Sequence, residues 1–324
     1  MTEVTKNLML FSGRSNKPLA ENIAKILKIN LSGVKINTFA NGEVFARYNQ
    51  SVRGSDLFIV QSVSNYHSGS VNDALMELLV MCDTAKRASA HFVTAVITHF
   101  GYSRQDKKSA AREPITAKLV ANMLTVAGVD RVITIDLHQG QIQGFFDQPV
   151  NHLTALPIFA SYYNNMNLEN VCIVSPDVGR AKAAKKLADL MDADLAIMHK
   201  SRPAHNKAEV SNVIGDVEGK VCILNDDMID TGGSIVAGTQ ALKLKGAKDV
   251  YVCATHGLFS GAAFERLDAE DIKEIVVCDT VPIPQDMLKG KFKTVSVAPL
   301  LAQAIANVFN NVSVSELFDP DFAL

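Results

Sequence analysis

Short apolar runs rich in β-branched residues alternate along the chain with longer segments in which apolar residues recur at helical spacing. In the first half, strands are predicted at residues 8–11, 34–39, 57–61, 92–98 and 131–136. In the second half, they are predicted at residues 171–175, 195–199, 221–225, 250–254 and 275–278. Helices are predicted between them, among others at residues 71–87, 116–127, 182–191 and 234–244. This alternation favours right-handed βαβ units and largely parallel sheets.

The number of predicted strands, about five in each half, indicates an α/β protein with two doubly wound, largely parallel-sheet domains. A length of 324 residues also fits about two domains. Pro149 and Pro157 interrupt the pattern, so we expect an N-terminal domain of residues 1–150 and a C-terminal domain of residues 151–324. The last helix of the chain can pack on the N-terminal domain in this arrangement.

Composition narrows the class of protein. The chain is 48% hydrophobic, which argues against disorder, and its formal net charge of −2 argues against a bulk nucleic-acid binder. Its five cysteines form no C-x-x-C pair and are predicted to be structural thiols of a reducing compartment. Neither a signal peptide nor an apolar run long enough for a membrane span is evident. We therefore expect a cytoplasmic protein with no membrane partner.

The strongest motif for chemistry follows the strand predicted at residues 221–225. Two adjacent carboxylates, Asp226 and Asp227, precede the turn Asp230-Thr231-Gly232-Gly233-Ser234 and a predicted helix. Glycines allow close backbone approach to a ligand, and a helix N-terminus favours an anion such as a phosphate. The carboxylates could accept hydrogen bonds from vicinal sugar hydroxyls. The alternative is an ordinary strand–turn–helix with Ser234 as N-cap. No P-loop and no dinucleotide-binding G-x-G-x-x-G accompanies the motif.

This motif resembles the ribose 5-phosphate-binding loop of phosphoribosyltransferases and, more closely, that of ribose-phosphate pyrophosphokinases. Further matches to the pyrophosphokinases lie at residues 39–44, 51–54, 76–79, 86–90, 100–106, 112–116, 136–138, 141–146, 175–179 and 200–203. The elements Arg104-Gln105-Asp106 and Asp136-Leu137-His138 look specific to the pyrophosphokinases. The resemblance covers nearly the whole chain, and it implies two phosphoribosyltransferase-type domains with the active site between them.

The resemblance implies transfer of the β,γ-diphosphate of ATP to the anomeric hydroxyl of ribose 5-phosphate, with Mg²⁺, giving phosphoribosyl diphosphate (PRPP) and AMP for nucleotide biosynthesis. It also implies a homo-oligomer, a hexamer built from dimers.

The resemblance gives roles to individual residues. The residues implied to bind ATP are Phe39, Asn41, Gly42, Glu43, Arg104 and Gln105. The metal-site residues are His138 and Asp177, and the catalytic residues are Lys200 and Arg202. Those implied to bind ribose 5-phosphate are Arg202, Asp226, Asp227, Asp230, Thr231, Gly232, Gly233 and Ser234. Positions of the family's regulatory phosphate/ADP site are matched by Ser51, Arg53, Ser313 and Ser315.

Simpler interpretations stand beside several of these roles. Phe39 could be a core residue, and His138 a polar residue satisfied at a strand end. The stretch around Lys200 could be a solvated basic loop, and the Ser313–Ser315 segment a helix cap. For the protein as a whole, the alternatives are a PRPP-consuming phosphoribosyltransferase and a catalytically silent regulatory subunit. The second would carry an insertion in the catalytic loop, and none is apparent between residues 200 and 213.

The chain departs from the family pattern at four places. Asn41 stands where aspartate is common, and Thr98-His99 where Pro-Tyr is usual. Many relatives have a second glycine where this chain has Arg180, and an arginine where it has Ala183. We expect the last two to change how the turn after Asp177 approaches its ligand.

Overall fold

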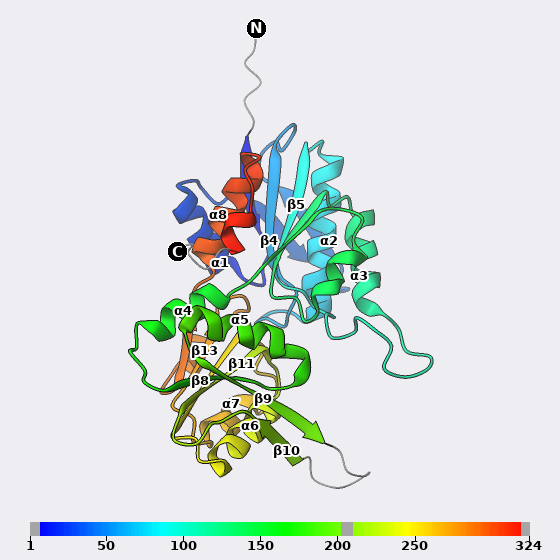
Figure 1. The fold of residues 1–324 in the computed structure, drawn as a ribbon. Coiled ribbons are helices and arrows are strands. Elements are labelled where there is room, and N and C mark those ends of the chain that lie inside the picture. The colour runs from blue at the N-terminus through cyan, green and yellow to red at the C-terminus, as the bar shows by residue number, and fades with distance from the viewer. Residues whose placement is uncertain (1–6, 202–209, 319–324) are drawn as a thin grey trace. The chain divides into compact units, whose positions relative to one another are not determined.

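A computed structural model of the chain describes residues 7–201 and 210–318. The chain forms two compact units. The first unit comprises Met1–Thr154, Thr280–Pro282 and Ser296–Leu324, and the second comprises Ala155–Asp279 and Ile283–Val295. Each contains a largely parallel sheet with helices packed against it (Figure 1). The C-terminal helix α8 (Ala298–Phe309) belongs to the first unit, where it packs on α1 (Lys17–Leu27).

The first unit is built on a five-stranded parallel sheet in the order β1-β4-β5-β6-β7. The strands are β1 (Leu8–Ser12), β4 (Asp56–Ser62), β5 (Phe92–His99), β6 (Arg131–Ile135) and β7 (Val150–Leu153). Leu57 and Ile59 of β4 pack in one core with α2 (Val71–Arg87) and α3 (Thr116–Val126). Figure 1 shows α1 and α8 on the other side of this sheet. Both faces are covered, so β4 is buried along nearly its whole length.

The second predicted strand lies outside this sheet. It forms β2 (Val34–Thr38), which pairs antiparallel with β3 (Val44–Tyr48) in a two-stranded hairpin. Alternate residues of β3 face inward, and Tyr48 donates from its hydroxyl to the Met81 carbonyl of α2 at 2.8 Å. One face of the hairpin therefore packs against α2, and the loop between β2 and β3 extends from the hairpin.

The second unit has a seven-stranded sheet in the order β10-β9-β8-β11-β12-β13-β14. Its strands are β8 (Val171–Ser175), β9 (Asp194–Ser201), β10 (Val210–Ile214), β11 (Val221–Ile229), β12 (Asp249–Gly257), β13 (Glu274–Cys278) and β14 (Phe292–Val295). Only the β9–β10 pair of this sheet is antiparallel. The chain proceeds from β8 toward one edge and from β11 toward the other. The strand order thus reverses between β8 and β11, where α/β sheets commonly bind ligands.

Helices cover both faces of the second sheet. They are α4 (Leu156–Asn164), α5 (Ala181–Met191), α6 (Gly233–Leu244) and α7 (Ala263–Asp268). Ile235 and Leu242 of α6 and Leu267 of α7 share a core with β8, β11, β12 and β13, whereas α4 packs against α5. Among the described residues, no helix combines the length and apolar character that crossing a membrane requires.

Candidate active site

Two loops of the first unit meet at the carboxyl ends of β5 and β6. Arg104 and Gln105 lie exposed in the loop after β5, and half-buried His138 lies in the turn after β6. The Gln141 amide, which follows His138, donates to the nearly buried carboxylate of Asp106 at 3.2 Å. Because β5 and β6 are parallel neighbours, their loops lie at one edge, and this hydrogen bond links them. The predicted ATP-binding pair and the predicted metal-site histidine therefore lie on adjoining loops.

The backbone before His138 has an unusual conformation. Asp136 has φ of +39°, a region that residues with a side chain seldom adopt. Its N–H donates to the Leu153 carbonyl at 3.0 Å, and the next N–H, of Leu137, donates to Nε2 of His152 at 2.9 Å. These two bonds to β7 hold the strained turn in place. They fix the direction in which the chain presents His138.

The loop that carries the predicted ATP-binding residues Phe39, Asn41, Gly42 and Glu43 joins β2 to β3. It is a tight turn in which Gly42 has φ of +91°, and the N–H groups of Phe39 and Gly42 are bonded within the turn at 2.8 Å. The Asn41 side-chain oxygen accepts from the Glu43 N–H at 3.2 Å, so an asparagine here stabilises the turn. The Phe39 ring is 53% exposed, and the core interpretation of this residue is therefore wrong.

One residue that sequence reasoning missed connects this hairpin to the sheet. Arg14 follows β1 and donates from Nη1 to the Thr38 hydroxyl, next to Phe39, at 3.0 Å. A lone arginine after a strand gives no signal in the sequence that it supports a hairpin beginning about twenty residues later.

In the second unit, β11 leads into the glycine-rich turn and then α6. The strand is longer than predicted, because it pairs with β12 as far as Ile229, and Asp226 and Asp227 lie within it. Gly232, with φ of +77°, is the N-cap of α6, so the N-cap interpretation of Ser234 is wrong. Among the described residues, a Cβ built at Gly233 would meet only the Thr231 hydroxyl, at 3.9 Å. The helix start therefore has open backbone, as an anion-binding turn requires.

The two carboxylates that precede this turn, Asp226 and Asp227, are neighbours and largely buried. Asp227 is 2% exposed, and its N–H donates to Oδ1 of Asp226 at 2.8 Å. Burial and the neighbouring Asp227 carboxylate raise the pKa of Asp226 well above its ordinary value, and Arg180 opposes that shift. Two neighbouring buried carboxylates resist being ionised together. A nearby cation favours the ionised form of both.

That cation comes from the turn after β8, the strand beside β11. Asp177 accepts the Arg180 N–H at 3.0 Å, and the Ser175 hydroxyl donates to the Asp177 carbonyl at 2.7 Å. The Arg180 side chain extends to the carboxylates, with Nε 3.9 Å from one oxygen of Asp226 and of Asp227. The predicted metal-site acid thus lies directly after β8, and the predicted sugar-binding acids Asp226 and Asp227 lie in β11, the two strands that flank the reversal of strand order.

Other predicted residues are placed less fully. Lys200 lies near the end of β9, with its side chain outside the described residues, and Arg202 lies outside them altogether. Ser51 accepts from the Arg53 N–H at 3.4 Å, and Ser313 accepts from the Ser315 N–H at 3.1 Å. The second bond lies next to a short 3₁₀ helix, Ser315–Phe318.

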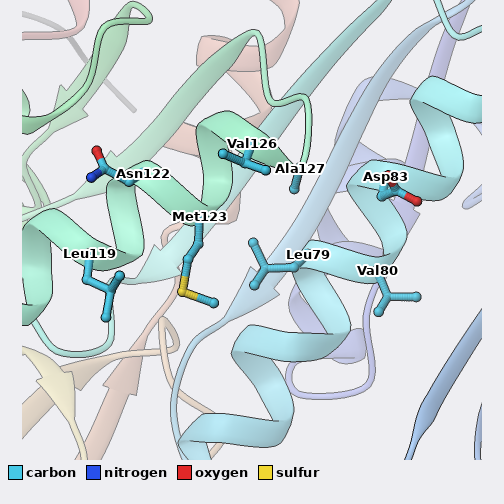
Figure 2. A pocket seen from close by; sticks show the side chains of 8 residues that line it. All are labelled: Leu79, Val80, Asp83, Leu119, Asn122, Met123, Val126 and Ala127. Carbon is cyan, nitrogen blue, oxygen red and sulfur yellow. The ribbon is translucent and has the colours of Figure 1, made fainter.

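A groove separate from these residues lies between α2 and α3 (Figure 2). Its volume is about 580 Å³, and the residues that line it are Leu79, Val80, Asp83, Leu119, Asn122, Met123, Val126 and Ala127. Leu119 and Val126 are 56% and 86% exposed. The lining is mostly apolar and includes none of the predicted site residues.

Comparison with known proteins decides the family. A model described as the N-terminal domain of ribose phosphate pyrophosphokinase matches residues 8–128, and a phosphoribosyl synthetase-associated domain matches residues 202–319. A ribose-phosphate pyrophosphokinase of Clostridium tetani is 49% identical over 98% of this chain and 99% of its own. One of Bacillus subtilis is 49% identical over 97% of this chain and 98% of its own.

The chain belongs to the ribose-phosphate pyrophosphokinase family. The family assignment extends to the fold, since the crystal structure of a phosphoribosylpyrophosphate synthetase from Mycobacterium smegmatis matches with a TM-score of 0.88 and 45% identity. That match covers 94% of this chain and all of the other. Members of the ribose-phosphate pyrophosphokinase family are diphosphotransferases, so the protein is an enzyme with two phosphoribosyltransferase-type α/β units.

Proposed function

We propose that this enzyme transfers the β,γ-diphosphate of ATP to the anomeric hydroxyl of D-ribose 5-phosphate, giving PRPP and AMP. One observation carries the assignment of the sugar site. In a member of this family, β11 brings two carboxylates and an open glycine turn to the point where the strand order reverses. A monophosphate suits the turn, and vicinal hydroxyls suit the carboxylates.

The ribose 5-phosphate site consists of residues of the second unit. The phosphate accepts hydrogen bonds from the backbone of residues 231–234 and from the hydroxyls of Thr231 and Ser234. Asp226 and Asp227 accept from the sugar hydroxyls, and Asp230 completes the turn by accepting at its carbonyl from the Ser260 N–H at 2.9 Å.

The ATP site consists of residues of the first unit. Arg104 is a planar donor suited to phosphate oxygens, and Gln105 is held by a hydrogen bond from the Thr116 hydroxyl. Phe39 offers an exposed ring on which adenine stacks, while Asn41, Gly42 and Glu43 supply polar edges. Two observations support this assignment. These side chains are exposed, and backbone hydrogen bonds hold the turn that carries Phe39.

Magnesium fits the donors that are present. Among the described residues, no group of three His, Cys, Asp or Glu could cage an ion. Mg²⁺ does not need such a cage, because it commonly keeps several waters and binds one or two carboxylates together with substrate phosphates. The exposed Asp177 carboxylate suits that role, and His138 suits contact through a coordinated water. When bound, the ion supplies positive charge that neutralises the polyphosphate.

Lys200 and Arg202 are the proposed catalytic residues. Charge develops on the oxygens around the β-phosphorus during in-line attack, and an ammonium and a forked guanidinium are suited to it. Arg202 also contacts ribose 5-phosphate in this proposal.

Regulation, assembly and location complete the proposal. Ser51, Arg53, Ser313 and Ser315 form a regulatory phosphate/ADP site, and the protein is a hexamer located in the cytoplasm. The exposed apolar side chains of Phe39, Leu119 and Val126 support assembly, because isolated subunits would leave them in water. The five cysteines are free thiols and buried, which supports a reducing compartment.

The decisive assay follows labelled phosphates. The pure protein is incubated with ribose 5-phosphate, Mg²⁺ and ATP labelled in either the α- or the β-phosphate. We expect β-label to move to PRPP and α-label to stay with AMP, with no transfer when the sugar is omitted. Consumption of added PRPP with a base, in place of its formation, would establish a phosphoribosyltransferase. No turnover in either direction would indicate a silent subunit.

A further inference from the structure

Arg180 is the feature of the sugar site that the family pattern does not anticipate. Its position is well defined, because its N–H is bonded to Asp177 and it directly precedes α5. Its side chain is 14% exposed and extends toward Asp226 and Asp227, whose side chains are 16% and 3% exposed. Two largely buried carboxylates and one largely buried guanidinium therefore share one small region of the second unit.

The guanidinium of Arg180 and the carboxylates of Asp226 and Asp227 stabilise one another's charges. Two neighbouring carboxylates in a poorly solvated place repel, and a buried charge is costly unless it has a partner. A guanidinium placed evenly between them reduces both costs. Support comes from Asp226, whose raised pKa is opposed by Arg180. Without the guanidinium, the pair would lose part of its ability to accept hydrogen bonds as an anion.

The separations between Arg180 and the two carboxylates are longer than hydrogen bonds. A separation of 3.9 Å is an ion pair but too long for a hydrogen bond. The buried Nε–H of Arg180 has no acceptor within hydrogen-bond reach among the described residues. A hydroxyl oxygen beside the line from Nε to a carboxylate oxygen could lie about 2.8 Å from both atoms. Such a hydroxyl would accept from Arg180 and donate to the acid, and so satisfy both.

We propose that Arg180 is a substrate-positioning residue of the sugar site, acting as counter-charge to Asp226 and Asp227 and donating from Nε to a ribose hydroxyl that these carboxylates accept from. The inference rests on the proposed function, because it takes this carboxylate pair as the acceptors of the sugar. Arg180 would add a hydrogen-bond donor to a site in which Asp226 and Asp227 are the acceptors. A sugar that lacks the hydroxyl in question would leave both the donor and the acceptor unpaired.

Calorimetric titration of sugar phosphates tests this role. Ribose 5-phosphate and its 2-deoxy and 3-deoxy analogues are titrated into the wild type, Arg180→Ala and Arg180→Lys. We expect Arg180→Ala to weaken ribose 5-phosphate binding by about ten- to one-hundredfold and to weaken binding of at least one deoxy analogue far less. Arg180→Lys keeps the charge but loses the Nε–H, so its loss for ribose 5-phosphate should be intermediate.

Controls separate this role from general damage and from the proposed function itself. Lys186→Ala removes an exposed cation from α5 and should change none of the affinities. ATP affinity should be unchanged in Arg180→Ala, and thermal unfolding checks that each variant is folded. Equal losses for all three sugars, or no loss, would overturn the role of Arg180. PRPP formation by the wild type is assayed separately, so a wild type that makes PRPP alongside equal losses rejects only this inference.

Discussion

Glu77 accepts two hydrogen bonds from Arg14, one from its backbone N–H at 2.6 Å and one from its side-chain Nε. Glu77 is fully buried in α2, and it also accepts a hydrogen bond from the Gln61 amide of β4 at 3.1 Å. The same arginine bonds Thr38 at the base of the β2–β3 hairpin. A buried acid thus anchors the loop after β1, and that loop in turn supports the hairpin that carries Phe39.

Glu77→Gln should lower the free energy of unfolding by about 1–3 kcal/mol, since it replaces a charged acceptor of a guanidinium by a neutral one of the same shape. We also expect weaker ATP binding, because the support of the hairpin is loosened. Urea unfolding and ATP titration measure the two effects. Glu21→Gln is the matched control, because its ion pair with Lys17 at 3.5 Å is exposed on both sides. Equal unfolding midpoints for the two variants would contradict the anchoring role.

Much of the framework could be read from local sequence. The helix predicted at residues 71–87 matches α2, and the strand predicted at residues 171–175 matches β8. Both succeed because their signals are local. Ser70 and Asp73 form a capping box at the start of α2, and β8 is a short run rich in β-branched residues that is buried in the sheet. The α/β class followed from such elements.

What could not be predicted depends on distant partners. The strand predicted at residues 34–39 alternates apolar and polar residues, as a half-buried strand does, and only its pairing with β3 shows that it belongs to a hairpin outside the main sheet. The burial of Glu77 depends on Arg14, which lies 63 residues away in the chain. Similarly, Arg180 was visible as a departure from a pattern, but its approach to Asp226 depends on β8 and β11 being neighbours.

Gly233→Ala should weaken ribose 5-phosphate binding with little change in stability. Within the described part of the chain, only the Thr231 hydroxyl lies near the added Cβ, so the fold should accept the methyl group where a phosphate would not. Gly232→Ala is the contrasting variant. Its φ of +77° and a Leu267 carbon 3.0 Å from the built Cβ predict a lower melting temperature. Sugar-phosphate titration and thermal unfolding separate the two, and unchanged affinity in Gly233→Ala would move the phosphate elsewhere.

Lys200→Ala should lower kcat by about 10²–10³-fold and leave ribose 5-phosphate binding nearly unchanged. An interaction made mainly in the transition state appears in turnover more than in substrate affinity. Steady-state kinetics with both substrates varied measure the effect. Lys289→Ala, which removes an exposed lysine from the same unit, should have normal kinetics. If both variants turn over alike, Lys200 has no catalytic role.

Activity per subunit should fall on dilution, and weaker ATP binding should appear first. In the family that the chain belongs to, we expect the Phe39–Glu43 loop to complete the ATP site of a neighbouring subunit. Phe39→Ala should reproduce the ATP defect without dissociation, because it removes a 53% exposed ring. Val312→Ala, at an apolar residue of the same exposure, is the control. Sedimentation and assays over one dilution series provide the test, and a fully active monomer would contradict a shared site.

Asp226→Asn should stabilise the protein at neutral and higher pH while weakening ribose 5-phosphate binding. The pKa of Asp226 is raised in the folded state, chiefly by burial and then by Asp227. Stability from such a group is complete below the ordinary carboxyl pKa and is lost as pH rises through the folded value. The wild type should therefore become progressively less stable than Asp226→Asn as pH rises from the ordinary carboxyl pKa, about 4, into the neutral range. Urea midpoints at several pH values measure this difference, with exposed Asp189→Asn as control. A stability gain that is equal at acid and neutral pH would show that ionisation of Asp226 does not destabilise the folded protein.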